Sequence, residues 1–178
     1  MRRLLLALLL GLFLTSCGDD GGDSAAPDGP TDAEFTTELL HRDAALLNLL
    51  DVSLGRDLDP SLAATGEQQR LDANERMATG FELLEAWGEE IPATSRDHGA
   101  EHGSDGDVPV IDGMPTGDDL QALGKLRGQA FVDEYVALLA AALESTRAFA
   151  EDHEGREAAA DQLAKAAAAS SQTALDGL

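Results

Sequence analysis

The stretch from Thr31 to Leu54, TDAEFTTELLHRDAALLNLLDVSL, constrains the fold more than any other part of the chain. Thr31 and Glu34 have the spacing of a capping box, in which two side chains satisfy free backbone amides at a helix start. Gly55 follows as a helix stop. At about 100° per residue, the large apolar side chains fall within one broad arc. These side chains are Phe35, Leu39, Leu46, Leu47, Leu49, Leu50 and Leu54. The stretch therefore predicts a helix with one face in a core.

Two charged residues interrupt this apolar arc. Arg42 and Asp43 lie on or beside the buried face, whereas His41 points roughly to the opposite side. Because a buried arginine must be paired, we predict that Arg42 and Asp43 take part in a core ion pair. Acids of a neighbouring helix, such as Glu75 or Glu82, are the expected partners of Arg42. The alternative interpretation is that the two residues are the remnant of a functional pocket.

The beginning of the chain, MRRLLLALLLGLFLTSCGDD, is typical of an exported protein. The apolar run that follows the two arginines is too short for a comfortable membrane span. The residues LTSC at 14–17 resemble a bacterial lipoprotein box, which implies cleavage before Cys17 and lipid on its sulfur. Residues 1–16 are then a signal peptide and 17–30 a flexible, lipid-anchored spacer. A plain signal peptide and a chance cysteine are the alternatives. We expect the protein on the outer face of the cytoplasmic membrane or in the periplasm.

The chain is strongly acidic, with 12 basic and 34 acidic residues and a formal charge of −22. Loss of residues 1–16 removes Arg2 and Arg3, which leaves 10 basic against 34 acidic residues and a charge of −24. Such a field repels phosphate backbones and anionic headgroups, which argues against nucleic acid partners and a basic membrane-docking surface. Lipid on Cys17 would be the contact with the membrane. With that single cysteine modified, no disulfide forms, and stability must come from packing.

The remaining segments predict further helices and no strand. A second helix is expected from about 65 to 90, with Pro60 as a breaker before it, a capping box at Thr65 and Gln68, and Pro92 at its end. Its predicted apolar face consists of Ala73, Met77, Phe81, Leu84 and Ile91. Residues 92–116 are expected to be a disordered linker within the domain 31–178. Helices over 117–127, 129–152 and 156–176 complete an all-α, antiparallel four-helix bundle of two hairpins.

Several short motifs resemble the bacterial family called domain of unknown function 305. Leu83-Leu84-Glu85-Ala86-Trp87-Gly88 resembles a Trp-Leu-x-x-Trp-Gly motif of that family, and Gly113-Met114-Pro115 resembles the entry to its second half. The resemblance implies an exported, ferritin-like four-helix protein built from two similar halves. Some members are associated with copper through paired histidines. Here Arg42-Asp43 and Ala142-Leu143 stand at those positions, so that ligand set is not implied for this chain.

The predicted linker holds the remaining candidate ligands. His98 and His102, with neighbouring aspartates and glutamates, could capture a divalent metal weakly if the linker folded around it. Glu38 and His41 have the Glu-x-x-His spacing of di-iron bundles, but that chemistry needs two such motifs. No phosphate loop, nucleophile elbow or His-Glu-x-x-His motif is present, and no cofactor is expected. The sequence predicts a non-enzymatic binding or interaction module whose protein partner is unknown. The alternative is a protein that handles copper or another divalent cation.

Overall fold

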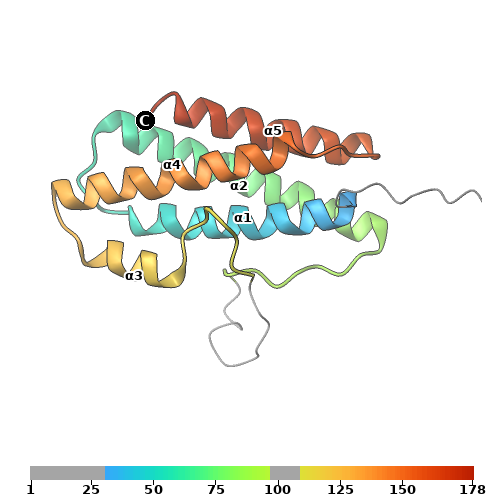
Figure 1. Ribbon diagram of the computed structural model, residues 1–178, viewed down its shortest axis with the longest axis horizontal. Helices are drawn as coiled ribbons and strands as arrows, with labels where there is room; N and C mark the ends of the chain where they lie inside the picture. The colour runs from blue at the N-terminus through green and yellow to red at the C-terminus, as the bar shows by residue number, and fades with distance from the viewer. Residues whose placement is uncertain (1–30, 97–108) are drawn as a thin grey trace, which may run out of the picture.

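The computed structural model describes residues 31–96 and 109–178, which form five helices and, within these ranges, no strand. The helices are α1 (Asp32–Val52), α2 (Pro60–Trp87), α3 (Gly117–Lys125), α4 (Gln129–Glu151) and α5 (Ala158–Leu175). Four of them are long, and α3 is a short helix between the two hairpins (Figure 1). The predicted all-α class is confirmed. The predicted Cys17 anchor and the 17–30 spacer lie outside the described residues.

The long helices form an antiparallel bundle in which every neighbour runs in the opposite direction (Figure 1). Helix α1 packs against α2 and α4, and α5 packs against the same two helices. Short connections join α1 to α2 and α4 to α5, which is the connectivity that brings antiparallel neighbours together. The predicted pair of hairpins is therefore confirmed, and α3 packs beside the α1–α4 edge.

The start of α1 has the predicted capping box. The Glu34 backbone N–H donates to Thr31 Oγ1 at 3.2 Å, and the Thr31 backbone N–H donates to a Glu34 carboxylate oxygen at 2.8 Å. The helix ends at Val52, and Gly55 takes a left-handed φ of 72° in the following turn. Leu54 therefore leaves the helical arc and is 64% exposed, so its predicted core position is wrong.

Helix α2 begins earlier than its capping pattern predicts. Asp59 is the N-cap, with its carboxylate accepting from the Ser61 backbone N–H at 2.8 Å, and Pro60 occupies the first helical turn. Proline is favoured there because its missing N–H would have no helical partner in any case. The predicted start at Thr65 is thus wrong. At the other end, Gly88 caps the helix with a left-handed φ of 75°, which leaves Ile91 outside it and exposed.

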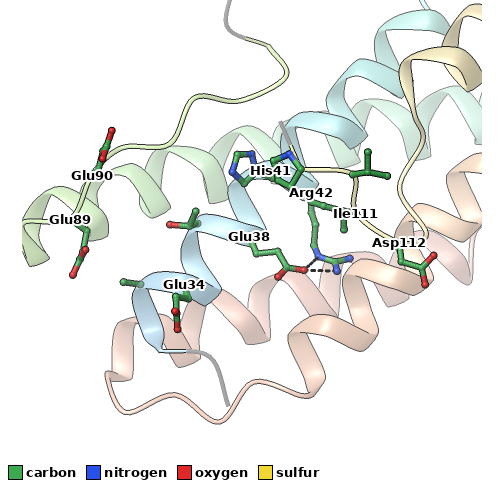
Figure 2. A pocket seen from close by; sticks show the side chains of 12 residues that line it. Glu34, Glu38, His41, Arg42, Glu89, Glu90, Ile111 and Asp112 are labelled. Carbon is green, nitrogen blue, oxygen red and sulfur yellow. Dashed lines mark hydrogen bonds and ion pairs between the residues drawn. The ribbon is translucent and has the colours of Figure 1, made fainter. Parts of the chain in front are cut away.

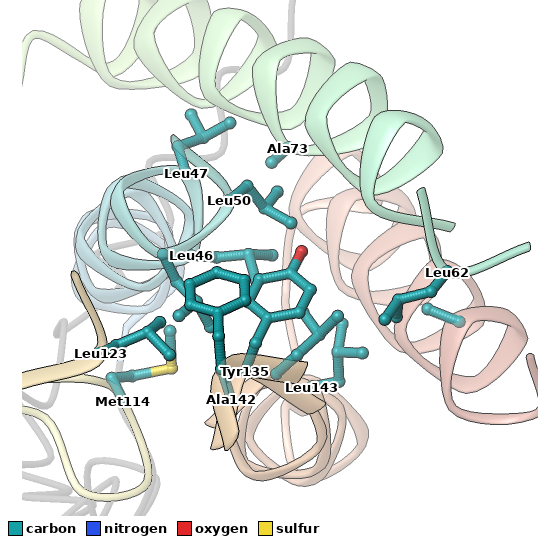
Figure 3. Packing of buried hydrophobic residues seen from close by; sticks show 14 residues of the cluster. Leu46, Leu47, Leu50, Leu62, Ala73, Met114, Leu123, Tyr135, Ala142 and Leu143 are labelled. Atoms are coloured by element: carbon teal, nitrogen blue, oxygen red, sulfur yellow. The ribbon is translucent and has the colours of Figure 1, made fainter. Parts of the chain in front are cut away.

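The interior consists of two apolar clusters. The larger joins the second half of α1 to α2, α3 and α4, with Tyr135 and Leu46 at its centre (Figure 3). The smaller contains Phe35 and Leu39 of α1 with Ala150 of α4 and apolar residues of α5. Burial of these side chains is the main source of stability, at roughly 25 cal/mol for each Å² of apolar surface.

Both described flanks of the predicted linker 92–116 belong to the fold. Thr94 and Met114 are buried at 3% and 8% exposure. Gly113 takes a φ of 77°, and a Cβ there would lie 2.6 Å from the Ser145 side chain, so the chain passes close to α4. The expectation of disorder is wrong for residues 92–96 and 109–116, because they contribute buried side chains to the bundle. Within the described ranges, no helix combines the length and the apolarity that a membrane crossing needs.

Candidate functional site

A groove runs along the side of α1 that faces away from the core. Helix α1 contributes one stripe to it, spaced so that its members share an arc of about 120°. This stripe consists of Ala33, Thr37, His41, Ala45 and Asn48. The opposite wall is residues 109–112, which we call the strap. Two cavities of about 610 and 350 Å³ follow one another along the groove and share His41 and residues 109–111. Figure 2 shows the residues that line the larger one.

Hydrogen bonds hold the strap in place. Ser145 Oγ on α4 donates to the Asp112 carbonyl oxygen at 2.7 Å, and Arg42 Nη1 donates to Ser145 Oγ at 2.8 Å. These two bonds connect α1, α4 and the strap. At the other end of the groove, Asn48 Nδ2 donates to Ser95 Oγ at 2.9 Å. The groove walls are therefore positioned by the bundle.

Five carboxylates line the larger cavity: those of Glu34, Glu38, Glu89, Glu90 and Asp112. Figure 2 shows Glu34, Glu89 and Glu90 near the start of α1 and Asp112 on the far side of Arg42. Hydrogen bonds from Thr31 hold the pKa of Glu34 below its usual value, so this carboxylate stays ionised at neutral pH.

Among the described residues that line this cavity, Arg42 is the only arginine or lysine. Arg42 Nη2 lies 2.7 Å from Glu38 Oε1, and its guanidinium stacks 4.4 Å from the centre of the Phe149 ring. Among the described residues, no cation pairs with Glu89, Glu90 or the Asp112 carboxylate. This end of the groove therefore keeps an excess of negative charge.

His41 is half-buried where the two cavities meet. Burial lowers its pKa from the usual value, and the nearby Glu38 carboxylate acts against that shift. The imidazole is thus neutral at physiological pH. Its Nδ1 atom is buried and makes no hydrogen bond within the described part of the chain. Sequence reasoning treated His41 as an exposed residue and missed this position. The repeated spacing of small and polar residues along the outer face of α1 was the available signal.

The two predicted core-pair residues are both buried, but they do not pair as expected. Arg42 binds Glu38 of its own helix, and neither Glu75 nor Glu82 is its partner. Asp43 instead binds Arg76 of α2. Asp43 therefore lies in an ion pair within the core, with Arg76 as its cation, and the expected partners of Arg42 are corrected to Glu38.

The Asp43–Arg76 pair lies deep in the bundle. Arg76 Nε donates to Asp43 Oδ2 at 3.0 Å and Nη2 donates to Oδ1 at 2.5 Å, with side-chain exposures of 4% and 1%. Arg76 Nη1 also donates to Ser170 Oγ at 2.6 Å, which extends the network to α5. Burial raises the pKa of Asp43, while the Arg76 charge and hydrogen bonds act to lower it. The pair is a structural link between three helices.

The other predicted ligands cannot be placed. His98 and His102 fall between the two described ranges, and Cys17 precedes them. Among residues 31–96 and 109–178, no group of three or more His, Cys, Asp or Glu side chains could hold a metal ion. A metal site built on the bundle itself therefore has no support from these residues.

No family model and no curated protein matches the sequence. Two solved structures share the fold. One is a DUF305 fragment from Deinococcus radiodurans, with 16% identity and a TM-score of 0.66 over 85% of this chain and 94% of that one. The other is a DUF305 protein from Streptomyces coelicolor that is described as secreted, with 14% identity and a TM-score of 0.66 over 82% of this chain and 88% of that one. At such low identities, the two matches establish the fold alone. They agree with the resemblance of the sequence motifs to DUF305.

Proposed function

We propose that this chain is a divergent member of the DUF305 family, exported and held at the cell envelope by lipid on Cys17. In that position it acts as a non-enzymatic binding module, with the groove along α1 as its binding surface. The observation that carries the proposal is the groove itself, which joins an apolar lining to five carboxylates and a buried, unbonded nitrogen of His41. Clefts that combine apolar walls with a few polar groups are the usual form of a binding site.

The absence of paired histidines supports a role other than the copper association of some relatives. The family positions for those ligands hold Arg42 and Asp43, and both side chains are engaged in ion pairs. A guanidinium bound to a carboxylate offers no lone pair to a metal. A ferritin-like scaffold that has exchanged its ligands for ion pairs keeps the bundle and loses that metal chemistry.

The first prediction concerns the anchor. Cells grown with labelled palmitate should incorporate label into the wild-type protein, and a Cys17→Ser variant should carry none, because the thiol is the only lipid acceptor of its type in the chain. A Ser16→Ala variant that keeps Cys17 serves as the matched control and should remain labelled. Label that persists in Cys17→Ser would remove the anchor from the proposal.

The second prediction concerns the groove. Val110 is 87% exposed and lines both cavities, so a photoreactive amino acid at that position leaves the bundle intact and faces any bound partner. Irradiation of cells should give a discrete adduct from this position. The matched control is Leu71, an apolar residue of α2 that is 57% exposed and lies outside the groove. Identical patterns from the two positions, or no adduct at 110, would contradict a binding role for the groove.

A further inference from the structure

The shape of the groove selects among possible occupants. Its α1 stripe extends from Ala33 to Asn48, and the helical rise between these two residues adds up to about 22 Å. A single ion or a compact metabolite fills only a fraction of that length. An extended peptide of about seven residues matches it at roughly 3.3 Å for each residue.

The charge along the groove is asymmetric. All five carboxylates line the cavity near the start of α1. Among the described residues, no acidic side chain lines the second cavity, and apolar side chains such as Ala45, Met114 and Leu120 do. A complementary ligand therefore has cations at one end and apolar groups at the other.

The free carboxylates have a further implication for the ligand. Glu34 is bound to Thr31 and Glu38 to Arg42, whereas Glu89, Glu90 and Asp112 have no cationic partner within the described residues. A carboxylate that has no cationic partner favours a ligand that brings a cation to it. The neutral imidazole of His41 adds a buried nitrogen, Nδ1, at the junction between the charged and apolar halves.

We propose that the occupant is an extended peptide segment with lysine or arginine at one end and apolar side chains at the other. Its basic end lies over the first turns of α1, beside Glu89 and Glu90, and its apolar end lies between Ala45 and the strap. This inference rests on the proposed function and names the chemistry of the partner. Because the ion pairs are partly exposed, binding weakens as ionic strength rises.

The test uses the purified lipidated protein in a neutral detergent and a fluorescent peptide of about seven residues, with lysines at one end and leucines at the other. Fluorescence anisotropy should report binding that weakens about 3- to 10-fold in a Glu89→Gln/Glu90→Gln variant, because two partly exposed pairs are lost. The matched control is Glu82→Gln/Glu85→Gln, which removes two exposed acids of α2 outside the groove and should leave the affinity unchanged.

Two further peptides and the small polyamine spermidine test which groups of the peptide the groove recognises. A peptide with glutamates in place of the lysines, or with serines in place of the leucines, should bind at least about tenfold more weakly than the parent peptide. Equal binding of the glutamate peptide would overturn the proposal, and so would spermidine binding as tightly as the parent peptide. A third outcome is that position 110 gives an adduct in cells but the lysine peptide does not bind the purified protein. The groove would then still be a binding surface, but a basic peptide would not be its partner.

Discussion

Replacing Arg76 with methionine should lower the free energy of unfolding by about 3–5 kcal/mol, because it leaves a buried carboxylate without its cation. Methionine keeps most of the side-chain volume, so the effect comes from charge and hydrogen bonds. The variant leaves the Asp43 carboxylate at 1% exposure with none of the three hydrogen bonds that Arg76 donates to it. It also removes the bond to Ser170 that extends the network to α5. Urea unfolding followed by circular dichroism measures the change.

The pH dependence of that loss has a definite sign. Burial already raises the pKa of Asp43, and removal of Arg76 takes away the contribution that lowers it. An acid whose pKa is raised by folding is favoured in the folded state while it is protonated, and that contribution is lost as pH rises through its folded pKa. The deficit of Arg76→Met should therefore be largest at neutral pH and shrink on acidification toward the usual pKa of aspartate. A deficit that stays constant between pH 7 and pH 4, or grows on acidification, would contradict this account.

Two further variants separate the buried pair from a surface pair. Arg147 binds Glu151 on the exposed side of α4, with side-chain exposures of 32% and 54%, so Arg147→Met should cost less than about 0.5 kcal/mol. The double variant Asp43→Leu/Arg76→Met removes both buried charges and should recover much of the loss, because the desolvation cost disappears with them. A double variant no more stable than Arg76→Met would mean that the hydrogen-bond network, with Ser170 included, outweighs the buried charge.

The first helix and the bundle class could be predicted because local and periodic signals agreed. The Thr31–Glu34 spacing caps α1 as predicted, and Phe35, Leu39 and Leu46 are buried at 0–1% exposure. The start of α2 was predicted wrongly because the sequence offers two candidate N-caps. Asp59 followed by Pro60 starts α2, although Thr65 and Gln68 also have capping-box spacing. An N-cap is useful only where the backbone enters a helix, and sequence spacing alone does not show which candidate has that geometry.

The predicted face of α2 was right for Ala73 and Leu84, but the rest of the buried face escaped prediction because most of it is not apolar. The whole buried face consists of Leu62, Gly66, Gln69, Ala73, Arg76, Gly80 and Leu84. The glycines allow close approach, since a Cβ at Gly80 would lie 3.0 Å from the Leu40 side chain and one at Gly66 would lie 3.2 Å from Tyr135 Oη. A prediction based on an apolar arc therefore placed Met77 and Phe81 in the core, although both are only half-buried. Spacings of three and four residues among small and polar side chains were the signal for Arg76.

The groove depends on contacts between segments far apart in the chain. The strap is held by Ser145, more than thirty residues away, through a bond that forms only once α4 packs beside α1. Nothing in the local sequence of residues 109–112 indicates this contact. The outer stripe of α1 could be recognised as polar and small, but its role as one wall of a groove depends on the position of the strap that forms the opposite wall.

Phe35→Ala should also lower the free energy of unfolding by about 3–5 kcal/mol, because it empties a fully buried site. Phe35 is 0% exposed, and its ring stacks on Phe149 at 5.0 Å and on His153 at 3.7 Å between centroids. Through these rings it joins α1 to the end of α4 and the turn that leads to α5. For a chain of this size the loss corresponds to a fall in melting temperature of about 10 °C, which calorimetry measures directly.

Leu54→Ala is the matched control, because Leu54 falls in the same sequence arc as Phe35 but is 64% exposed. Its truncation should cost less than about 0.5 kcal/mol, since little apolar surface is returned to water. The contrast tests the end of α1 at Val52 as well as the packing of Phe35. Equal losses for the two variants would mean that α1 continues past Val52 and buries Leu54, and the turn at Gly55 would then have to lie elsewhere.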